Sequence, residues 1–487
     1  MSDSFTSLND IMNAINFSHD HALPTLSTFL PLALALLLLL RFVSRRYLST
    51  LRQYPGHFLA SGSRIYRLLC VASGQSHLHM IALHRRYGPI VRIAPDELSF
   101  SSPEAARQLL SAGKGFHKTP FYNVFPPENP DIFTETREAV HAQKKRVVSG
   151  PYSMASMQKL TPYIDKAIDS LLSKLNQYAE GSGQVNLGDW LHYFAFDVLG
   201  EVAFSRPFGF LHSGVDVEGA IHAIDQSQWY NGIVSQVPEL DFFLRRNPFW
   251  KYVPALGTGN ALITRMTLKT VAERKPFGKT RMTDRRDLLQ SLIEAHLKDS
   301  EKFTEGDVFA VAHGAIFAGS DSTASTMQSF FWYILRDQRV FTTLVAEIRS
   351  ATESGILSHN VQCRLIPPGG AQINGVTLPA GVSVAVNAWV THLDTQIFGQ
   401  DADEFRPERW LHDVNAAKQM ERYMFQFGGG SHLCIGRNLA LLEMNRLLPC
   451  LLREYDFTLT DPMQKLRASA TFFVIQSSLD TNIKSLR

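Results

Sequence analysis

The chain has 487 residues, of which 48 are Lys or Arg and 45 are Asp or Glu, so its charges nearly balance. A balanced chain gives no electrostatic indication of a nucleic-acid partner. Its four cysteines, Cys70, Cys363, Cys434 and Cys450, show neither a paired framework nor a zinc-ligand spacing, which excludes a disulfide-rich secreted fold and fits a reducing compartment. No linker, repeat or low-complexity run divides the chain after its N-terminal region, so we predict one large domain.

Residues 22–43 predict a transmembrane anchor. They include five consecutive leucines, 36–40, and match the ~20 residues that a membrane helix needs. The stretch begins too far along the chain, and lacks the small-residue cleavage site, to be a removed signal peptide. Four arginines follow between residues 41 and 52, whereas residues 1–21 contain no Lys or Arg, so the positive-inside rule places the rest of the chain in the cytosol. We expect a single-pass protein of the endoplasmic reticulum membrane.

The segments flanking this anchor complete the predicted organisation. Residues 1–21 form a lumenal N-terminus, in which Asn16-Phe-Ser is a glycosylation sequon close to the membrane. Residues 44–56 are basic and end in Tyr54-Pro-Gly, a pair that predicts a turn, so we expect a hinge here. Residues 57–487 then form the one large globular domain.

Two patterns early in this domain predict regular structure. Val91 and Ile93, then Leu98 and Phe100, alternate with other residues and predict a pair of strands around Pro95-Asp96. Apolar residues at helical spacing between residues 160 and 175 predict an amphipathic core helix.

A long apolar helix is predicted to begin at Thr304-x-x-Asp307, which reads as a capping box, and to run into Trp332. Inside it lies Ala318-Gly-Ser-Asp-Ser-Thr323. Small and hydroxyl residues are poor helix formers, so this cluster favours a kink. The alternative is close packing of small residues against a neighbouring helix.

Further along the chain, Asn374-Gly375 between apolar residues predicts a tight hairpin. Alternating valines at 382, 384 and 386 predict a following strand.

The chain centres on the glycine-rich loop from Phe427 to Ala440, which delivers Cys434 to the start of a helix. A helix N-terminus presents unpaired N–H groups and partial positive charge, so this position is expected to favour the thiolate. Gly430 and Gly436 would let the backbone approach a flat ligand closely. The alternative is that Cys434 is an ordinary buried thiol.

Phe427, Gly430, Cys434 and Gly436 fit Phe-x-x-Gly-x-x-x-Cys-x-Gly, which resembles the haem-binding loop of the cytochrome P-450 haem-thiolate monooxygenases. Composition predicts roughly 0.001 chance matches in a chain of this kind. The resemblance implies a mainly α fold with a small β-rich subdomain, preceded by one transmembrane helix. It also implies haem b with Cys434 as the axial thiolate ligand of iron.

The family resemblance assigns roles to the cluster at residues 318–323, which is similar to a segment on the oxygen side of the haem. Gly319 would help the helix open there, Asp321 would carry protons inward, and Ser322 would donate a hydrogen bond to the bound oxygen. Serine stands where the family usually has threonine, so its hydroxyl is held less firmly at χ1. Thr323 is the rival donor, turned about 100° away along the helix.

Further roles are implied by position. Arg146 in His141-Ala-Gln-Lys-Lys-Arg146, Arg364 and His432 are the expected haem-propionate ligands, with a charged surface turn as the alternative for Arg146. The aromatic and proline-rich run 121–134 would face the substrate, or else form a solvent-exposed loop. Residues 189–248 resemble fungal members that act in secondary metabolism.

One element of the family is missing. No Glu-x-x-Arg occurs between residues 347 and 404, although Phe405-Arg-Pro-Glu-Arg-Trp410 matches the segment whose arginine pairs with it. Arg409 is therefore expected to lack its carboxylate, and removing one member of a buried ion pair costs about 3–5 kcal/mol. Either an exon is absent at Gln362-Cys363 or the protein itself lacks the helix; we favour the first, since both flanks match the family.

The resemblance implies a monooxygenase that inserts one oxygen atom of O2 into an apolar small molecule. Gly181-Ser-Gly183 and Gly257-Thr-Gly259 are only fragments of a dinucleotide fingerprint, so NADPH-derived electrons must come from a separate flavoprotein reductase in the same membrane. Two alternatives stay open: a remnant that lacks haem or activity, and a haem-thiolate isomerase or dehydratase that needs no reductase.

Overall fold

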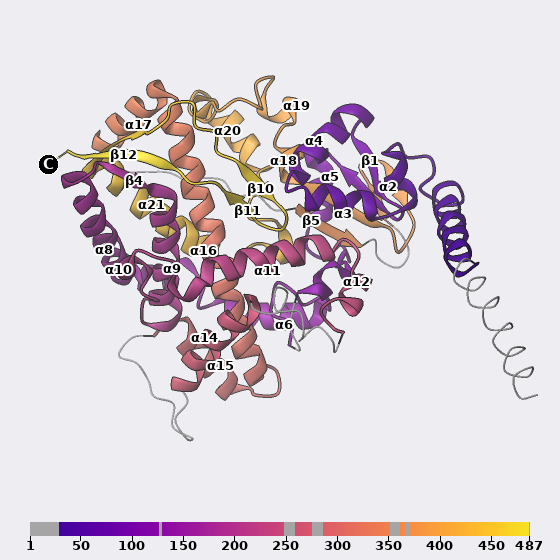
Figure 1. Ribbon diagram of the computed structural model, residues 1–487, viewed down its shortest axis with the longest axis horizontal. Coiled ribbons are helices and arrows are strands. Elements are labelled where there is room, and N and C mark those ends of the chain that lie inside the picture. Colours follow the sequence, from indigo (N-terminus) through magenta and orange to yellow (C-terminus); the bar gives the residue numbers. More distant parts are fainter. Residues whose placement is uncertain are drawn as a thin grey trace, which may run out of the picture.

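The computed structural model describes residues 29–125, 129–247, 259–274, 286–350, 361–365 and 371–486. Helices make up most of this part of the chain, and short strands are distributed among them (Figure 1). The four longest labelled helices are α8 (Thr161–Glu180), α9 (Leu187–Phe204), α16 (Glu305–Arg336) and α21 (Arg437–Glu454). All four contribute to one large apolar core.

Shorter helices surround these four. They are α2 (Phe58–Gly62), α3 (Ile65–Ala72), α4 (Ser76–Tyr87), α5 (Pro103–Leu110), α6 (Glu138–Ser149), α7 (Met154–Gln158), α10 (Phe210–Ser213), α11 (Ala220–Val234), α12 (Glu239–Phe243), α14 (Gly259–Glu273), α15 (Leu288–Lys298), α17 (Gln338–Ser350), α18 (Ala388–Thr391), α19 (Thr395–Phe398) and α20 (Val414–Glu421). Single 3-10 turns are η1 (Pro120–Val124), η2 (Val217–Gly219), η4 (Pro407–Trp410) and η5 (Gly430–His432).

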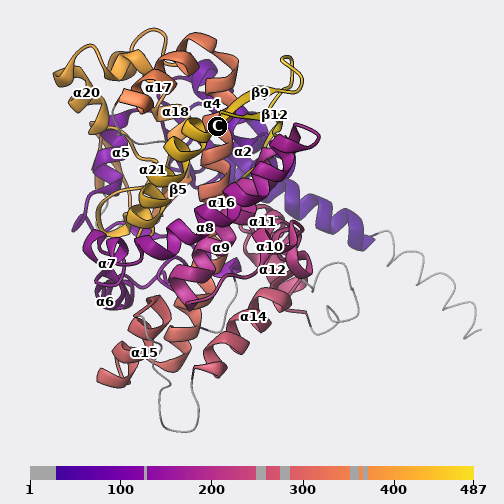
Figure 2. The same ribbon diagram turned by 90° about the vertical axis from the view of Figure 1, so that its left-hand side faces the viewer.

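The N-terminal helix, residues 29–47, projects away from the body of the protein in both ribbon views (Figures 1 and 2). Its five consecutive leucines, 36–40, are 56–63% exposed. Within the described ranges, no helix combines the length, apolarity and low charge that crossing a bilayer demands. Asn16 and residues 22–28 of the expected anchor lie outside the described residues.

The predicted hinge at 44–56 packs on the domain through Arg92. The buried guanidinium of Arg92 donates from Nη2 to the carbonyl oxygens of Arg45 at 2.8 Å and Pro95 at 2.6 Å. The backbone N–H of Arg92 donates to the carbonyl oxygen of Pro55 at 2.7 Å. A side chain at Gly56 would overlap the Arg92 carbonyl, so only glycine allows this close approach.

The largest sheet confirms the predicted strand pair. Its strands are β1 (Ile90–Ala94), β2 (Glu97–Phe100), β8 (Ser383–Asn387), β5 (Val361–Leu365) and β3 (His117–Lys118), in that spatial order. β1 pairs antiparallel with β2, and β2 pairs parallel with β8, the strand predicted from the valines. Every residue of β2 and β8 is buried, so this sheet is covered on both faces rather than on one.

The remaining strands are spread over separate sheets, so the expectation of one β-rich subdomain is too simple. Strands β4 (Gln184–Asn186), β12 (Asp480–Ser485) and β9 (Tyr455–Leu459) form one sheet in that order, and β10 (Ala468–Ala470) pairs with β11 (Val474–Gln476). β6 (Ala371–Ile373) and β7 (Val376–Leu378) form the predicted hairpin. Asn374 and Gly375 at its tip have φ values of +47° and +78°, as such a tight turn requires.

Two predicted helices are confirmed. α8 buries Ile164, Ile168, Leu171 and Leu175, which are spaced along one face. α16 begins with the predicted capping box, in which Thr304 Oγ1 accepts from the Asp307 N–H and the Asp307 carboxylate accepts from the Thr304 N–H. α16 is helical without a break through residues 318–323, and the hydroxyl groups of Ser320 and Ser322 there donate to carbonyls one turn earlier, contacts that often bend a helix. The kink itself stays a prediction.

Candidate active site

Cys434 lies between η5 and α21, three residues before the helix begins, as the loop pattern predicted. Its N–H donates to the Phe427 carbonyl oxygen at 2.8 Å, which closes the loop on itself. The thiol side chain is exposed, and the N–H groups of Gly436 and Arg437 donate hydrogen bonds to its sulfur. The loop therefore presents one sulfur atom at an accessible surface.

Although Cys434 is exposed, many protein groups surround its thiol, and the desolvation that they cause raises the pKa of the thiol above its ordinary value. The N–H groups of Gly436 and Arg437, then the charges of Lys145 and Arg437, oppose this rise but do not overcome it. The N–H groups at the helix start thus act in the predicted direction, but desolvation outweighs them in the free thiol, so the net shift does not favour the thiolate. A metal ion bound to the sulfur would displace the proton outright.

The two glycines of the loop pattern serve different needs. Gly430 has φ +56°, and a side chain there would overlap the Leu110 carbonyl at the end of α5. Its role is thus close packing of protein backbone, and not only approach to a flat ligand as predicted. A side chain at Gly436 would contact the Cys434 sulfur at 3.9 Å, so glycine there keeps space beside the sulfur open.

Helix α6 turns Lys145, and not Arg146, toward this loop. Lys145 Nζ donates to the carbonyl oxygens of Ser431 at 2.7 Å and Leu433 at 2.8 Å. Arg146, the residue predicted for this role, is exposed. One residue is about 100° on a helix, so the sequence alone could not choose between neighbouring cations. Burial lowers the pKa of Lys145, and the nearby Cys434 opposes that shift.

His432 joins two further α6 residues beside the loop. Its ring stacks on that of His141 with 4.3 Å between centroids, and its Nε2 lies 2.9 Å from Glu138 Oε1. The ligand atoms of these three residues lie within 4.8 Å of one another. His141 and Lys145 are four residues apart and share a helix face, a spacing that could have indicated both. Arg364 lies in β5, and its side chain is outside the description.

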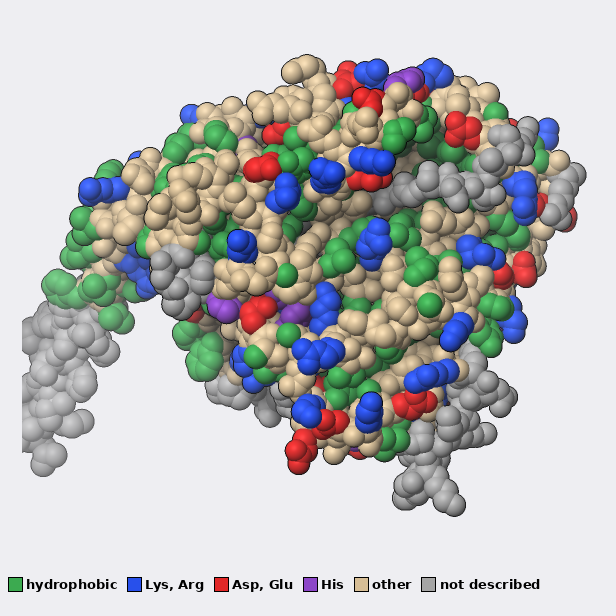
Figure 3. All heavy atoms as spheres, turned by 180° about the vertical axis from the view of Figure 1, so that it is seen from behind, with side chains coloured by type: hydrophobic (Ala, Val, Ile, Leu, Met, Phe, Trp, Pro, Cys, Tyr) green, Lys and Arg blue, Asp and Glu red, His purple; other side chains and the backbone are tan. Residues whose placement is uncertain are grey.

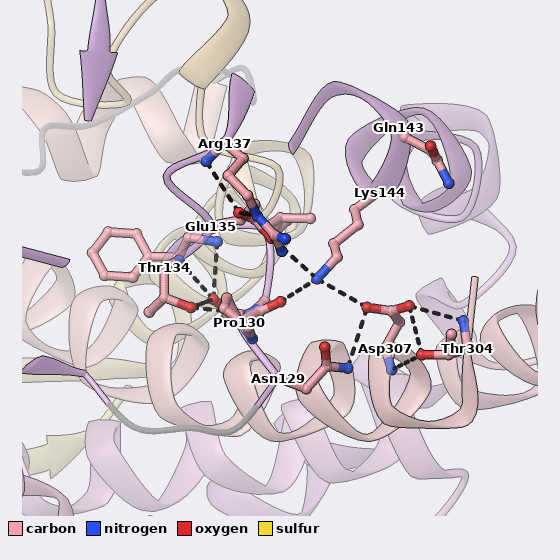
Figure 4. A network of polar contacts seen from close by, with 12 residues as sticks. Asn129, Pro130, Thr134, Glu135, Arg137, Gln143, Lys144, Thr304 and Asp307 are labelled. Carbon is pink, nitrogen blue, oxygen red and sulfur yellow. Dashed lines mark hydrogen bonds and ion pairs between the residues drawn. The ribbon is translucent and has the colours of Figure 1, made fainter. Parts of the chain in front are cut away.

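A buried ion-pair network holds α6 against the start of α16 (Figure 4). Lys144 Nζ lies 2.9 Å from Asp307 Oδ1 and 3.5 Å from Glu135 Oε2, and it donates to the Pro130 carbonyl oxygen at 2.5 Å. Arg137 adds a two-pronged pair to Glu135, with both N···O distances 2.8 Å. This network positions the helix that carries Lys145 and His141 at the Cys434 loop.

The segment at residues 318–323 presents its side chains in two directions. Ser322 is half-buried beside exposed Ala318, and its Oγ donates to the Ala318 carbonyl oxygen at 2.8 Å. Thr323 is buried. A side chain at Gly319 would lie 3.2 Å from Leu199 Cδ1, so Gly319 allows α9 to pack closely here, while its predicted part in opening the helix stays a prediction. Asp321 also points to α9, where it meets His192.

Aromatic side chains gather beside the same helix. Phe472 lies 4.6 Å from Phe125, 5.7 Å from Phe133 and 6.3 Å from Phe121, measured between ring centroids. Two residues later, the Val474 carbonyl oxygen accepts from Ser325 Oγ at 2.8 Å, one turn from Ser322. The run 121–134 thus contributes rings to an aromatic cluster and is not simply a solvent-exposed loop.

These groups suit a haem. The sulfur of Cys434 is an accessible soft ligand for iron, while Lys145, His141 and His432 are cationic or imidazole groups beside it that suit ring carboxylates. Gly436 keeps the neighbourhood of the sulfur free of a side chain. The donor set therefore fits an iron-containing ring with acidic substituents.

Arg409 lacks its usual carboxylate, as predicted from the missing Glu-x-x-Arg, but it has another carboxylate partner in the described structure. Its Nη1 lies 2.9 Å from Asp401 Oδ1, and its Nη2 donates to the Asp401 carbonyl oxygen at 2.7 Å. The Phe398 carbonyl oxygen also accepts from Arg409. A residue eight positions earlier in the chain thus takes the place of the missing Glu-x-x-Arg carboxylate.

The Cytochrome P450 family model matches residues 62–363 and 357–481, and the two segments meet where the Glu-x-x-Arg helix is missing. Cytochrome P450 monooxygenase cicH of Emericella nidulans is 31% identical over 89% of this chain and 94% of its own length. Cytochrome P450 monooxygenase gsfF of Penicillium aethiopicum is 29% identical over 91% and 95%. Cytochrome P450 monooxygenase hepC of Aspergillus oryzae is 32% identical over 85% and 88%. The family model, the cysteine loop, the mainly helical fold and these relatives show that the chain belongs to the cytochrome P450 family and is a monooxygenase, one class of oxidoreductase.

Proposed function

We propose that this protein inserts one oxygen atom of O2 into an apolar aromatic small molecule in a fungal secondary-metabolite pathway. The aromatic cluster formed by Phe121, Tyr122, Phe125, Phe133 and Phe472 carries this proposal. The cluster is linked to α16 through Val474, two residues after Phe472, whose carbonyl oxygen accepts from Ser325 one turn from Ser322. Aromatic walls favour apolar ligands. Relatives from fungi named as monooxygenases support the reaction class.

A bound haem would supply the oxygen-activating chemistry, and Cys434 would hold its iron. The residues of the chain would bind, orient and protonate. Lys145 and His432 would hold the ring carboxylates, Ser322 would donate a hydrogen bond to the oxygen, and Asp321 would move protons toward Ser322. Apolar rings of the cluster exclude water and orient the substrate.

The proposal places the protein in the endoplasmic reticulum membrane with its catalytic domain in the cytosol. In support, apolar side chains cover much of the projecting helix at residues 29–47 (Figure 3). The nearby helices α2 and α3 expose Phe58, Leu59, Ile65 and Leu69 as well. A membrane location would bring the domain to an NADPH-dependent flavoprotein reductase, the proposed electron source.

Membranes from cells that express this chain together with such a reductase test the proposal. Incubated with NADPH, O2 and a panel of apolar aromatic compounds, they should yield products heavier by one oxygen atom, and only when the reductase is present. The protein should sediment with the membranes. Product formed without reductase would favour an isomerase or dehydratase, and recovery in the soluble fraction would contradict the location.

Ser322→Ala should leave substrate binding nearly unchanged but lower the ratio of product to NADPH consumed on the order of tenfold, because a positioned proton donor is lost. Thr323→Ala is the matched control on the same helix. Its hydroxyl is buried away from the Ser322 face, so the ratio should stay near that of the wild type. An unchanged ratio in Ser322→Ala with a collapsed ratio in Thr323→Ala would reverse the two roles.

A second candidate function rests on one observation, the split of the family match at residues 357–363. If the missing helix is needed for haem binding, the 487-residue chain is a haem-deficient remnant. The haem content of the purified chain, measured per mole of protein, separates this reading from the monooxygenase.

A further inference from the structure

His192 of α9 forms an ion pair with Asp321 of α16, 129 positions later in the chain. Its Nε2 lies 2.9 Å from Asp321 Oδ1. The imidazole side chain is 23% exposed, whereas the carboxylate is 5% exposed. The ring is therefore the partly exposed member of the pair, and the carboxylate is the buried member.

The second oxygen of this carboxylate is available. Asp321 Oδ2 is buried and accepts no hydrogen bond from any side chain or backbone group in the described ranges. A buried polar atom without a partner is costly and often marks a site of proton or water exchange. One carboxylate oxygen is thus held by His192, and the other is open as an acceptor.

Other ionisable groups extend this pair toward the surface. Asp225 of α11 and Asp189 of α9 are near enough for their charges to act on His192, as those of His222 and Asp216 act on Asp225. Burial lowers the pKa of His192, but the hydrogen bond and charge of Asp321, with the charges of Asp225 and Asp189, raise it overall. Burial and the negative charge of Asp321 raise the pKa of Asp225 to about 6. These groups can exchange protons near neutral pH.

We propose that His192 positions Asp321 and supplies it with protons from the α9 and α11 surface. This inference rests on the proposed monooxygenase function, in which Asp321 passes protons to the Ser322 side. Each transfer breaks the Nε2–H bond of the charged imidazole and forms an O–H bond on Asp321. The neutral ring then regains one proton from solvent, with Asp225 as a neighbouring donor. One proton moves inward, and nothing is oxidised or reduced.

His192→Gln tests the proposal, because glutamine keeps an N–H donor for Asp321 but cannot exchange its proton. At pH 7, product formation should slow about a hundredfold, the lower end of the range for loss of general acid–base catalysis. The solvent isotope effect should increase, while the substrate-induced spectral shift keeps the same dissociation constant. His212→Gln, an exposed histidine on α10, is the control and should match the wild type. Asp225→Asn should remove the change in rate near pH 6.

Thermal unfolding provides a readout that needs no turnover. The pKa of His192 is raised in the folded state. The ion pair therefore contributes its full stability to the fold below 6.5, the unfolded pKa of the imidazole, and this contribution is lost as the pH rises through the higher folded pKa. The wild type should therefore have a higher Tm than His192→Gln at pH 6, and this difference should disappear by pH 9. Asp225 is present in both proteins, so its titration is common to the two measurements.

The outcomes separate the two hypotheses. Absence of reductase-dependent product from the wild type would overturn the proposed function and this inference with it. An active wild type whose rate, isotope effect and pH profile are unchanged in His192→Gln would overturn the inference alone, leaving His192 a structural residue. A Tm difference that does not depend on pH would refute the ion pair itself.

Discussion

Cys434→Ala should abolish the thiolate-type absorption of the reduced, CO-bound protein and reduce product formation to the limit of detection. Alanine has no ligand atom, and neither backbone group of Gly436 or Arg437 can replace a sulfur donor to iron. Because the Cys434 side chain is exposed, the substitution creates no core cavity, and the far-UV circular dichroism of the variant should equal that of the wild type.

Cys450→Ala is the matched control for this experiment. Cys450 is half-buried on α21, the helix that Cys434 precedes, so its loss removes a thiol from the same element without touching the loop. This variant should keep the wild-type spectrum. A Cys434→Ala protein with an unaltered thiolate spectrum would contradict the ligand assignment, and loss of that spectrum in Cys450→Ala would move the assignment to Cys450.

Lys144→Met should destabilise the protein by about 3–5 kcal/mol, the range found when one partner of a buried ion pair is removed. The side chains of Lys144, Asp307 and Glu135 are 5%, 6% and 1% exposed, so the two carboxylates would remain buried without their shared cation. The expected result is a lower midpoint of urea unfolding at an unchanged slope. Weaker haem retention should accompany it, because α6 carries Lys145 and His141 to the Cys434 loop.

Lys302→Met is the control for charge removal. Lys302 pairs with Asp299 at 2.7 Å, but their side chains are 69% and 40% exposed, so water screens this pair and its loss should change the stability far less than loss of Lys144. In the double variant Lys144→Met with Asp307→Asn, the loss should be smaller than the sum of the single effects. A Lys144→Met protein no less stable than Lys302→Met would contradict the importance of the buried network.

The same network predicts a dependence on pH. Burial would raise the pKa of Glu135, but hydrogen bonds from Arg137 and the charge of Lys144 lower it from 4.5 to about 2. Hydrogen bonds from Lys144 and Thr304 likewise outweigh burial and lower the pKa of Asp307. A carboxyl group whose pKa is depressed in the folded state contributes stability at pH values above its unfolded pKa. This contribution is lost as the pH falls through the folded pKa. The stability difference between the wild type and Lys144→Met should therefore narrow from pH 5 toward pH 2.

Much of the local structure is determined by the amino-acid sequence alone. The capping box at Thr304 and Asp307, the hairpin at Asn374-Gly375 and the placement of Cys434 before a helix depend on groups a few positions apart. Such groups meet as soon as the local backbone forms, so their chemistry can be recognised from spacing. The family was identifiable for the same reason, because its loop pattern spans only ten residues.

Only the tertiary structure decided which side chains meet across the core. Lys145 faces the cysteine loop while Arg146 is exposed, and Gly319 serves the packing of α9, because the rotation of each helix depends on its neighbours. Arg409 pairs with Asp401 in a chain that lacks the expected partner helix. His192 and Asp321 lie 129 positions apart, and Lys144 and Asp307 lie 163 apart by their numbers. No local pattern encodes such pairs, since they form only when separate helices pack into one core.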